Sequence, residues 1–167
     1  SGDHIVSSKS VFGSTHQLFV NILPKWGIHT TYVDAIDYEG YEQEIKPETK
    51  FVYIETPSNP GLDIIDIKRL AEICRKKNVL LVVDNCFATP VLQQPLKLGA
   101  DIIIHSATKY MDGQGRVLGG LIVSTQEIIA KIQGFAERLS LRGAPCLRKH
   151  KARTIARAAR FYKAAIV

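Results

Sequence analysis

A lysine follows an apolar run in the stretch DIIIHSATKY at residues 101–110. A lone lysine is most often solvated, and Lys109 by itself could be an ordinary surface residue. At the mouth of a buried sheet, however, a lysine loses part of its hydration, which favours the neutral, nucleophilic amine. Such an amine can form a Schiff base with an aldehyde. The sequence therefore offers Lys109 as a candidate catalytic residue.

Polar residues end other apolar runs in the same manner. A carboxylate ends FVYIE, a second ends VLLVVD, an amide lies in the TPSNP stretch after the first, and two hydroxyls come just before the lysine. These residues are Glu55, Asp84, Asn59, Ser106 and Thr108. Taken singly, Asp84 and Asn59 could be turn or capping residues. Their joint occurrence at the ends of apolar runs indicates a shared site.

The elements that must position these residues are short apolar runs that alternate with helical patterns. We expect strands at residues 4–7, 30–33, 51–55, 79–84, 101–105 and 119–123. We expect helices at 14–25 and 66–78, the second with Asp66 as its N-cap. Strands that are apolar throughout are buried on both faces, as in a parallel sheet covered by helices. The predicted fold class is α/β, a mostly parallel sheet with helices on both faces in three layers.

The combination of polar groups suits pyridoxal phosphate. Ligands bind such sheets beyond the carboxyl ends of the strands, where these groups gather. This cofactor needs a lysine for its aldehyde, a carboxylate for its ring nitrogen, hydroxyls for its phosphate and a flat residue against its ring. Those roles can be filled by Lys109, Asp84, Ser106, Thr108 and an aromatic residue such as Phe12. The glycines after the lysine miss the spacing of the dinucleotide fingerprint, so NAD is not expected.

Composition sets further bounds on function. The chain has 167 residues and is 46% hydrophobic, which is enough for one sizeable core. It contains no apolar run long enough to cross a membrane and starts without an export signal, so we expect a cytoplasmic protein. Its three cysteines form no Cys-x-x-Cys pair, and its histidines do not have metal-ligand spacing. We therefore expect reduced thiols and no metal.

The net charge of +6 is concentrated near the C-terminus. Residues 137–163 contain nine lysines and arginines and one acid, and the pattern at 147–167 predicts a basic helix. We therefore divide the chain into a cofactor-binding α/β core at 1–136 and a basic helical segment at 137–167 that is not an independent domain. A solvated helix face is the favoured interpretation, and a phosphate-binding surface is the alternative. Few aromatics accompany the charges, so nucleic acid is not expected as a partner.

Three stretches resemble the transsulfuration enzymes, the Cys/Met-metabolism family of pyridoxal-phosphate proteins. They are ETPSNP at 55–60, VVDNCFATP at 82–90 and HSATKY at 105–110. The resemblance runs in order from about Gly2 to Ser124. It implies the large domain of fold-type I pyridoxal-phosphate enzymes and a small amino-acid substrate. It also implies a homo-oligomer, which in this family is a tetramer.

The resemblance assigns a role to each motif residue. Lys109 would be the Schiff-base lysine, and Asp84 would be the partner of the pyridinium nitrogen. Ser106 and Thr108 would bind the phosphate, and Asn59 would lie near the phenolic oxygen of the cofactor.

Two further residues belong to the implied site. Phe12 in KSVFGSTH stands where many relatives have a ring-stacking tyrosine, so the resemblance implies stacking without a hydroxyl. Glu55 would belong to the supporting shell.

The loop after the lysine, MDGQGRVLGG at 111–120, looks like that of O-succinylhomoserine sulfhydrylases within the family. This implies γ-replacement in methionine biosynthesis, in which sulfide displaces succinate to give homocysteine. Activity of the cystathionine γ-synthase or γ-lyase type is one alternative. A catalytically inactive remnant that acts as a folded or partner-binding domain is another.

Family members are much longer than this chain. The resemblance implies that the phosphate-binding loop, the neighbouring subunit's Tyr and Arg, and the arginine for the substrate carboxylate are missing. We therefore expect a partial or degenerate chain that is a poor enzyme by itself.

Overall fold

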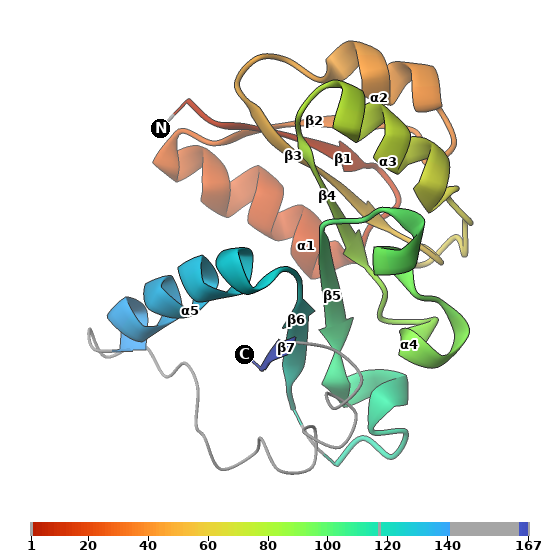
Figure 1. The fold of residues 1–167 in the computed structure, drawn as a ribbon, viewed down its shortest axis with the longest axis vertical. Coiled ribbons are helices and arrows are strands. Elements are labelled where there is room, and N and C mark those ends of the chain that lie inside the picture. The colour runs from red at the N-terminus through yellow and green to blue at the C-terminus, as the bar shows by residue number, and fades with distance from the viewer. Residues whose placement is uncertain (1, 117, 141–163, 167) are drawn as a thin grey trace.

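The computed structural model describes residues 2–116, 118–140 and 164–166. Seven strands form a sheet in the order β2-β1-β3-β4-β5-β6-β7 (Figure 1). They are β1 (His4–Ser8), β2 (His29–Val33), β3 (Thr49–Glu55), β4 (Leu80–Asp84), β5 (Ile102–Ser106), β6 (Gly120–Val123) and β7 (Ala164–Ile166). Neighbouring strands from β2 to β5 are parallel, whereas the β5–β6 and β6–β7 pairs are antiparallel. The prediction of a mostly parallel sheet is confirmed.

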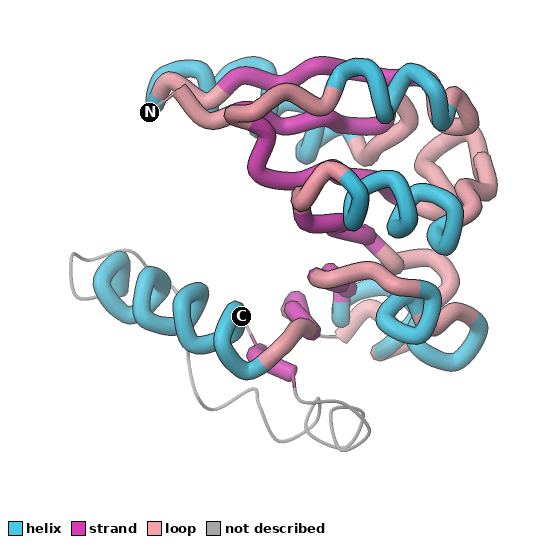
Figure 2. Tube along the Cα trace, turned by 45° about the horizontal axis from the view of Figure 1, so that its top comes forward, coloured by secondary structure: helices cyan, strands magenta, loops and turns pink. Residues whose placement is uncertain are grey.

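Helices cover both faces of this sheet. They are α1 (Gly13–Gln17), α2 (Tyr38–Glu44), α3 (Ile67–Lys76), α4 (Thr89–Leu92) and α5 (Gln126–Ser140), with shorter turns η1 (Leu18–Ile22), η2 (Leu23–Trp26), η3 (Pro95–Leu98) and η4 (Ala107–Met111). In Figure 1, α1 and α5 lie on one side of the sheet, and α2 and α3 lie on the other. Figure 2 shows the strands, in magenta, side by side between the helices, in cyan. The predicted three-layer α/β fold is therefore confirmed.

The apolar strands supply a core on each face of the sheet. Side chains alternate between the faces of a strand, so Val52 and Ile54 pack in the cluster that includes α2 and α3 residues. Tyr53 and the partly buried Phe51 pack in the cluster that includes Phe19 of η1. Because both faces of β3 are covered, its sequence is a continuous apolar run and does not alternate between apolar and polar residues.

The predicted helix after residue 66 forms as the capping pattern indicates. The Asp66 side chain accepts a hydrogen bond from the N–H of Arg69 at 3.0 Å, which satisfies one free donor of the first turn. Arg75 and Lys76 lie in the last turn, where positive charge is favourable. Asn78 then adopts a left-handed conformation at φ 55°, and the chain turns into β4.

Two sequence expectations need correction. The helix predicted at 14–25 is a succession of α1, η1 and η2, the last with a proline in its first turn. Residues 164–166 of the predicted basic helix form strand β7, because the free edge of β6 offers backbone groups that this short apolar segment can pair with. The rest of that helix lies outside the described residues. The division of the chain after residue 136 stays a prediction, and that position lies within α5.

None of the helices among the described residues has the length and apolar character needed to cross a membrane.

Candidate active site

A cavity of ≈ 640 Å³ opens beyond the carboxyl ends of β3, β4 and β5. Its size is typical of small-molecule sites. Segments far apart in the chain line it: Phe12, Glu55, Asn59, Asp84, Cys86, Phe87, Ile104, His105, Ser106, Lys109, Tyr110, Gly113, Gly115, Gly119 and Gly120.

Strand register brings the polar residues together at this cavity. Glu55 is paired with Asp84, and Asp84 is paired with Ile104, two residues before Ser106. Since residues two apart on a strand point to the same face, these side chains share one face of the sheet. Of the six predicted site residues, the cavity wall contains five: Lys109, Asp84, Ser106, Phe12 and Asn59.

Asp84 is a buried carboxylate whose two oxygens both accept hydrogen bonds. The side chain of this residue lies at the end of β4, and the residue is 7% exposed. Its Oδ2 accepts from the hydroxyl of Tyr53 at 3.1 Å, and its Oδ1 accepts from the N–H of Cys86 at 3.1 Å. Hydrogen bonds of this kind stabilise a charged carboxylate and fix its orientation. The site thus holds a negative group ready for a cationic ligand.

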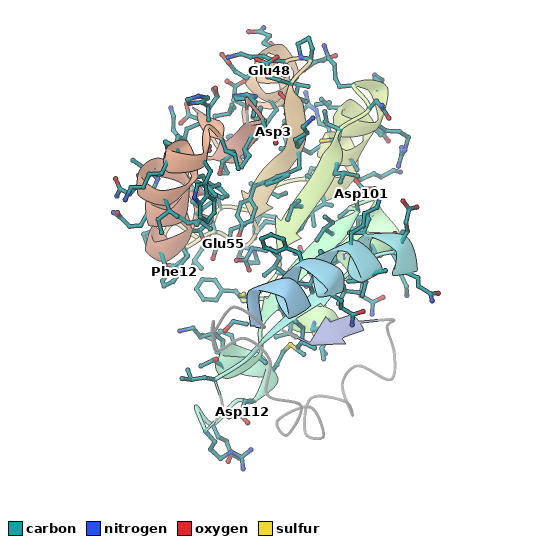
Figure 3. All side chains as sticks on the ribbon, turned by 90° about the vertical axis from the view of Figure 1, so that its left-hand side faces the viewer. Asp3, Phe12, Glu48, Glu55, Asp101 and Asp112 are labelled. Atoms are coloured by element: carbon teal, nitrogen blue, oxygen red, sulfur yellow. The ribbon has the colours of Figure 1, made fainter. Side chains whose placement is uncertain are left out.

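Glu55 lies beside Asp84 and is only 3% exposed. Burial, followed by the charge of Asp84, raises the pKa of Glu55 to about 7, although a bond from a backbone N–H acts in the other direction. That N–H belongs to Phe12 and donates to Glu55 Oε2 at 2.6 Å. Figure 3 shows Phe12 and Glu55 next to each other at this end of the sheet. Glu55 therefore holds the backbone of the predicted stacking residue.

Lys109 lies in the helical turn η4, and its backbone departs from helical geometry at φ −86° and ψ −129°. It lines the cavity, but its side chain is exposed. The predicted partial desolvation of its amine stays a prediction. Gly113 and Gly115, which follow Lys109 in the chain, line the same cavity.

The two predicted hydroxyl ligands are placed differently. Ser106 lines the cavity, and its backbone N–H donates to Cys86 Sγ at 2.8 Å. Thr108 is not among the lining residues: its Oγ1 accepts from the N–H of Gly119 at 3.1 Å and donates to the Gly119 carbonyl at 3.4 Å. Thr108 thus braces the glycine loop before β6. Its predicted role as a phosphate ligand stays a prediction.

Comparison with known proteins decides the family. The family described as Cys/Met metabolism PLP-dependent enzyme matches residues 1–150, which is most of the chain. The chain belongs to this family.

Individual relatives agree with this membership. The chain is 52% identical over 135 residues to O-succinylhomoserine sulfhydrylase of Pseudomonas aeruginosa, covering 81% of this chain and 34% of the relative. It is 47% identical over 137 residues to cystathionine gamma-lyase of Bacillus subtilis, covering 82% and 36%. The crystal structure of cystathionine gamma-lyase from Lactobacillus plantarum complexed with L-serine superposes with a TM-score of 0.77 at 40% identity, covering 81% of this chain and 35% of that one. The chain spans about a third of the length of these relatives.

The residues at the cavity fit the pyridoxal phosphate on which this Cys/Met-metabolism family depends. A buried carboxylate with both oxygens held by donors, Asp84, suits a protonated ring nitrogen. Lys109 offers an amine, Phe12 a ring and Ser106 a hydroxyl at the same cavity. These side chains therefore supply the kinds of chemical group that pyridoxal phosphate needs.

Sequence reasoning missed two amide residues, Asn85 and Gln93, that hold the loop after β4. Asn85 is fully buried, and its side chain donates to the carbonyls of Thr89 and Gln93 at 3.2 and 3.0 Å. Gln93 in turn donates to Asn85 Oδ1 and to the carbonyl of Thr56, both at 2.8 Å. These bonds tie the loop after β4 to the loop after β3. The signal in the sequence was two amide residues within a stretch that otherwise resembles the family.

Sequence reasoning also missed three residues that line the cavity: Cys86, Phe87 and Tyr110. Cys86 lines the cavity, and burial, followed by the charge of Asp84, raises the pKa of its thiol. Phe87 and Tyr110 meet edge to face with ring centroids 6.1 Å apart. This aromatic pair joins the loop after β4 to the turn that carries the candidate lysine.

Proposed function

We propose that this chain forms the cofactor-binding part of a pyridoxal-phosphate-dependent enzyme that replaces the γ-substituent of an activated homoserine. In the proposed reaction, the Cγ–O bond of O-succinylhomoserine breaks and a Cγ–S bond to sulfide forms, giving homocysteine and succinate. The observation that carries the proposal is the joint placement of Lys109 and Asp84 at one cavity with Ser106 and Phe12. The 52% identity to a sulfhydrylase of that name supports the choice of reaction.

The proposed roles follow from the chemistry of each side chain. The cofactor, when bound, supplies an electron sink for charge that develops on the substrate. Asp84 would keep the proton on the ring nitrogen, and Phe12 would stack against the ring. Lys109 would hold the aldehyde through Nζ and, when free, would move protons at the substrate carbons. Ser106 would donate to the phosphate, and Asn59 would bind near the phenolic oxygen.

A γ-lyase reaction is the second candidate. It is favoured by the 47% identity to a cystathionine gamma-lyase and by the likeness to a solved lyase of that kind. The two candidates differ in whether an external sulfur nucleophile adds to the γ-carbon. An assay with O-succinylhomoserine and with cystathionine, each with and without sulfide, separates them by the sulfur product that is formed.

Homo-oligomerisation, a small amino-acid substrate and a cytoplasmic location complete the proposal. The adjacent exposed residues Val91 and Leu92 support association, because exposed apolar surface tends to be covered. The exposed Lys109 supports low activity for this chain by itself. We expect a turnover at least about a hundredfold below that of a complete family member, since positioning contacts can be worth that much.

Borohydride reduction tests the central assignment. The protein is incubated with pyridoxal phosphate and reduced, and its peptides are mapped. We expect stable attachment at Lys109, no attachment in Lys109→Ala and unchanged attachment in Lys131→Ala. Lys131 is the matched control because it is exposed on α5 and bonded to Glu127. Attachment at another lysine with Lys109 unlabelled would overturn the assignment.

A further inference from the structure

Tyr53 places a hydroxyl close to the candidate site without lining the cavity. It is an interior residue of β3, is 6% exposed, and packs edge to face against Phe19 with ring centroids 5.2 Å apart. In the sheet Tyr53 is paired with Val82, and Asp84 lies two residues further along β4 on the same face. The long tyrosine side chain spans this diagonal and donates to Asp84 Oδ2 at 3.1 Å.

The hydrogen bond from Tyr53 makes Asp84 and its neighbouring acid unequal. Asp84 has two donors, the Tyr53 hydroxyl and the N–H of Cys86, whereas Glu55 has one, the N–H of Phe12. Hydrogen-bond donors favour the charged form of a carboxyl, and the charge of a neighbouring acid disfavours it. Burial, followed by the charge of Asp84, raises the pKa of Glu55 to about 7, in line with this difference in donors.

The Tyr53 hydroxyl is itself a dependable donor. Burial, followed by the charge of Asp84, raises its pKa above the usual value, so the phenol keeps its proton at neutral pH. Its ring is fixed by the packing against Phe19, which restricts the direction of the hydroxyl. A group held in this way orients its partner, as supporting residues do around bound cofactors and metals.

We propose that Tyr53 is a positioning residue whose hydroxyl holds the Asp84 carboxylate in the orientation and charge state that pair with the ring nitrogen of pyridoxal phosphate. The inference rests on the proposed function, because it assumes that Asp84 meets that nitrogen. Tyr53 touches no ligand itself and acts through Asp84.

The test compares Tyr53→Phe with Tyr41→Phe in the purified protein. Both variants remove one hydroxyl from a buried tyrosine, but Tyr41 lies in the apolar cluster on the other face of the sheet. The dissociation constant for pyridoxal phosphate is measured by absorbance titration. A lost bond to a charged group corresponds to about a tenfold change, so we expect about tenfold weaker binding for Tyr53→Phe and little change for Tyr41→Phe.

The route through Asp84 is tested by a double-variant cycle. In an Asp84→Asn background, Tyr53→Phe should weaken cofactor binding no further, because the group on which it acts is gone. Independent, additive losses would show that Tyr53 only supports the fold. The cofactor absorption band also reports the pH at which the bound ring nitrogen loses its proton. This pH should fall in Tyr53→Phe and stay unchanged in Tyr41→Phe.

The outcomes separate this inference from the proposed function. If the unaltered protein shows no attachment at Lys109, the proposed function fails and this inference fails with it. If attachment occurs and the two tyrosine variants behave alike, the inference alone is overturned. Should Tyr53→Phe not fold, 3-fluorotyrosine at position 53 replaces it. This residue keeps the ring and changes the strength of the hydrogen bond to Asp84, so the pH at which the ring nitrogen loses its proton should shift, and an unchanged band would refute the inference.

Discussion

The two ends of the parallel strands treat buried polar groups differently. At the amino end, the buried ring of His4 has hydroxyl partners at both nitrogens, Thr49 at 2.8 Å and Thr31 at 2.9 Å. At the carboxyl end, Glu55 and Asp84 are two buried acids in register on neighbouring strands. The ring of His4 therefore has uncharged hydrogen-bond partners at both nitrogens and needs no ligand. The carboxyl end places two acids beside a cavity, and neither forms an ion pair with a described residue. Buried acids of this kind are typical of functional sites.

The positions of charged residues and the pKa shifts show the same contrast between the two ends of the strands. Figure 3 shows Asp3 and Glu48 at one end of the strands, and Phe12 and Glu55 at the other. At the amino end, burial, followed by the charge of Lys46, lowers the pKa of His4 and keeps its ring neutral. At the carboxyl end, burial raises the pKa of Glu55 to about 7. The amino end therefore holds a neutral buried ring, and the carboxyl end holds an acid whose pKa lies near neutral pH.

The largest expected effect is on function at the carboxyl end. Asp84→Asn keeps the shape of the side chain but cannot hold a ring proton as a carboxylate does. We expect a loss of turnover on the order of a hundredfold or more, with cofactor still bound. The free energy of unfolding should change little or rise, because one of two adjacent acids is removed. Turnover, cofactor absorbance and urea unfolding are measured together, and unchanged turnover would contradict the role of Asp84.

The next effect is on stability at the amino end. His4→Ala leaves the Thr49 and Thr31 hydroxyls without their ring partner and opens a small cavity, so the free energy of unfolding should fall by about 2 kcal/mol. Cofactor binding by the folded variant should be unchanged. Urea unfolding and absorbance titration measure the two quantities. A variant with normal stability and weakened cofactor binding would reverse the contrast between the two ends.

The smallest expected effect is a pH dependence that has opposite sign for Glu55 and for the two buried histidines, His4 and His105. The pKa of Glu55 rises from 4.5 in the unfolded chain to about 7, so the folded state binds more protons and its stability falls as pH rises through this range. Relative to the unaltered protein, Glu55→Gln should gain about 1–2 kcal/mol between pH 4.5 and pH 8. Unfolding at several pH values measures this gain, and a variant that follows the unaltered protein at every pH would contradict it.

The same pH series also measures the contribution of two buried histidines to stability, which changes with pH in the opposite direction. The pKa values of His4 and His105 are lowered from 6.5, chiefly by burial, so the unfolded state binds more protons. Their contribution is present above pH 6.5 and is lost as pH falls through the folded-state pKa values. His4→Gln should therefore flatten the acid side of the profile. An acid side that is identical in this variant would show that the amino end does not titrate.

Much of the fold could be predicted because its signals are local. The continuous apolar runs of β3, β4 and β5 have this pattern since both faces are buried, and Asp66 caps its helix within one turn. The placement of Lys109 and Asp84 at strand ends also followed from sequence, because parallel strands end at the same edge of a sheet. The predicted helix at 164–166 was wrong, since an edge strand far away in the chain supplies the pairing.

By itself, then, the sequence determined which segments form the layers and which reactive groups lie at their ends, because burial pattern and capping act over a few neighbouring residues. Tertiary structure alone decided how those groups are held. The bond from Tyr53 to Asp84 joins residues 31 apart, and the bond from Phe12 to Glu55 joins residues 43 apart. The cavity beside Lys109 is likewise lined by segments far apart in the chain. Strand register and the packing of distant segments fix these distances, and neither can be read from local patterns of side chains.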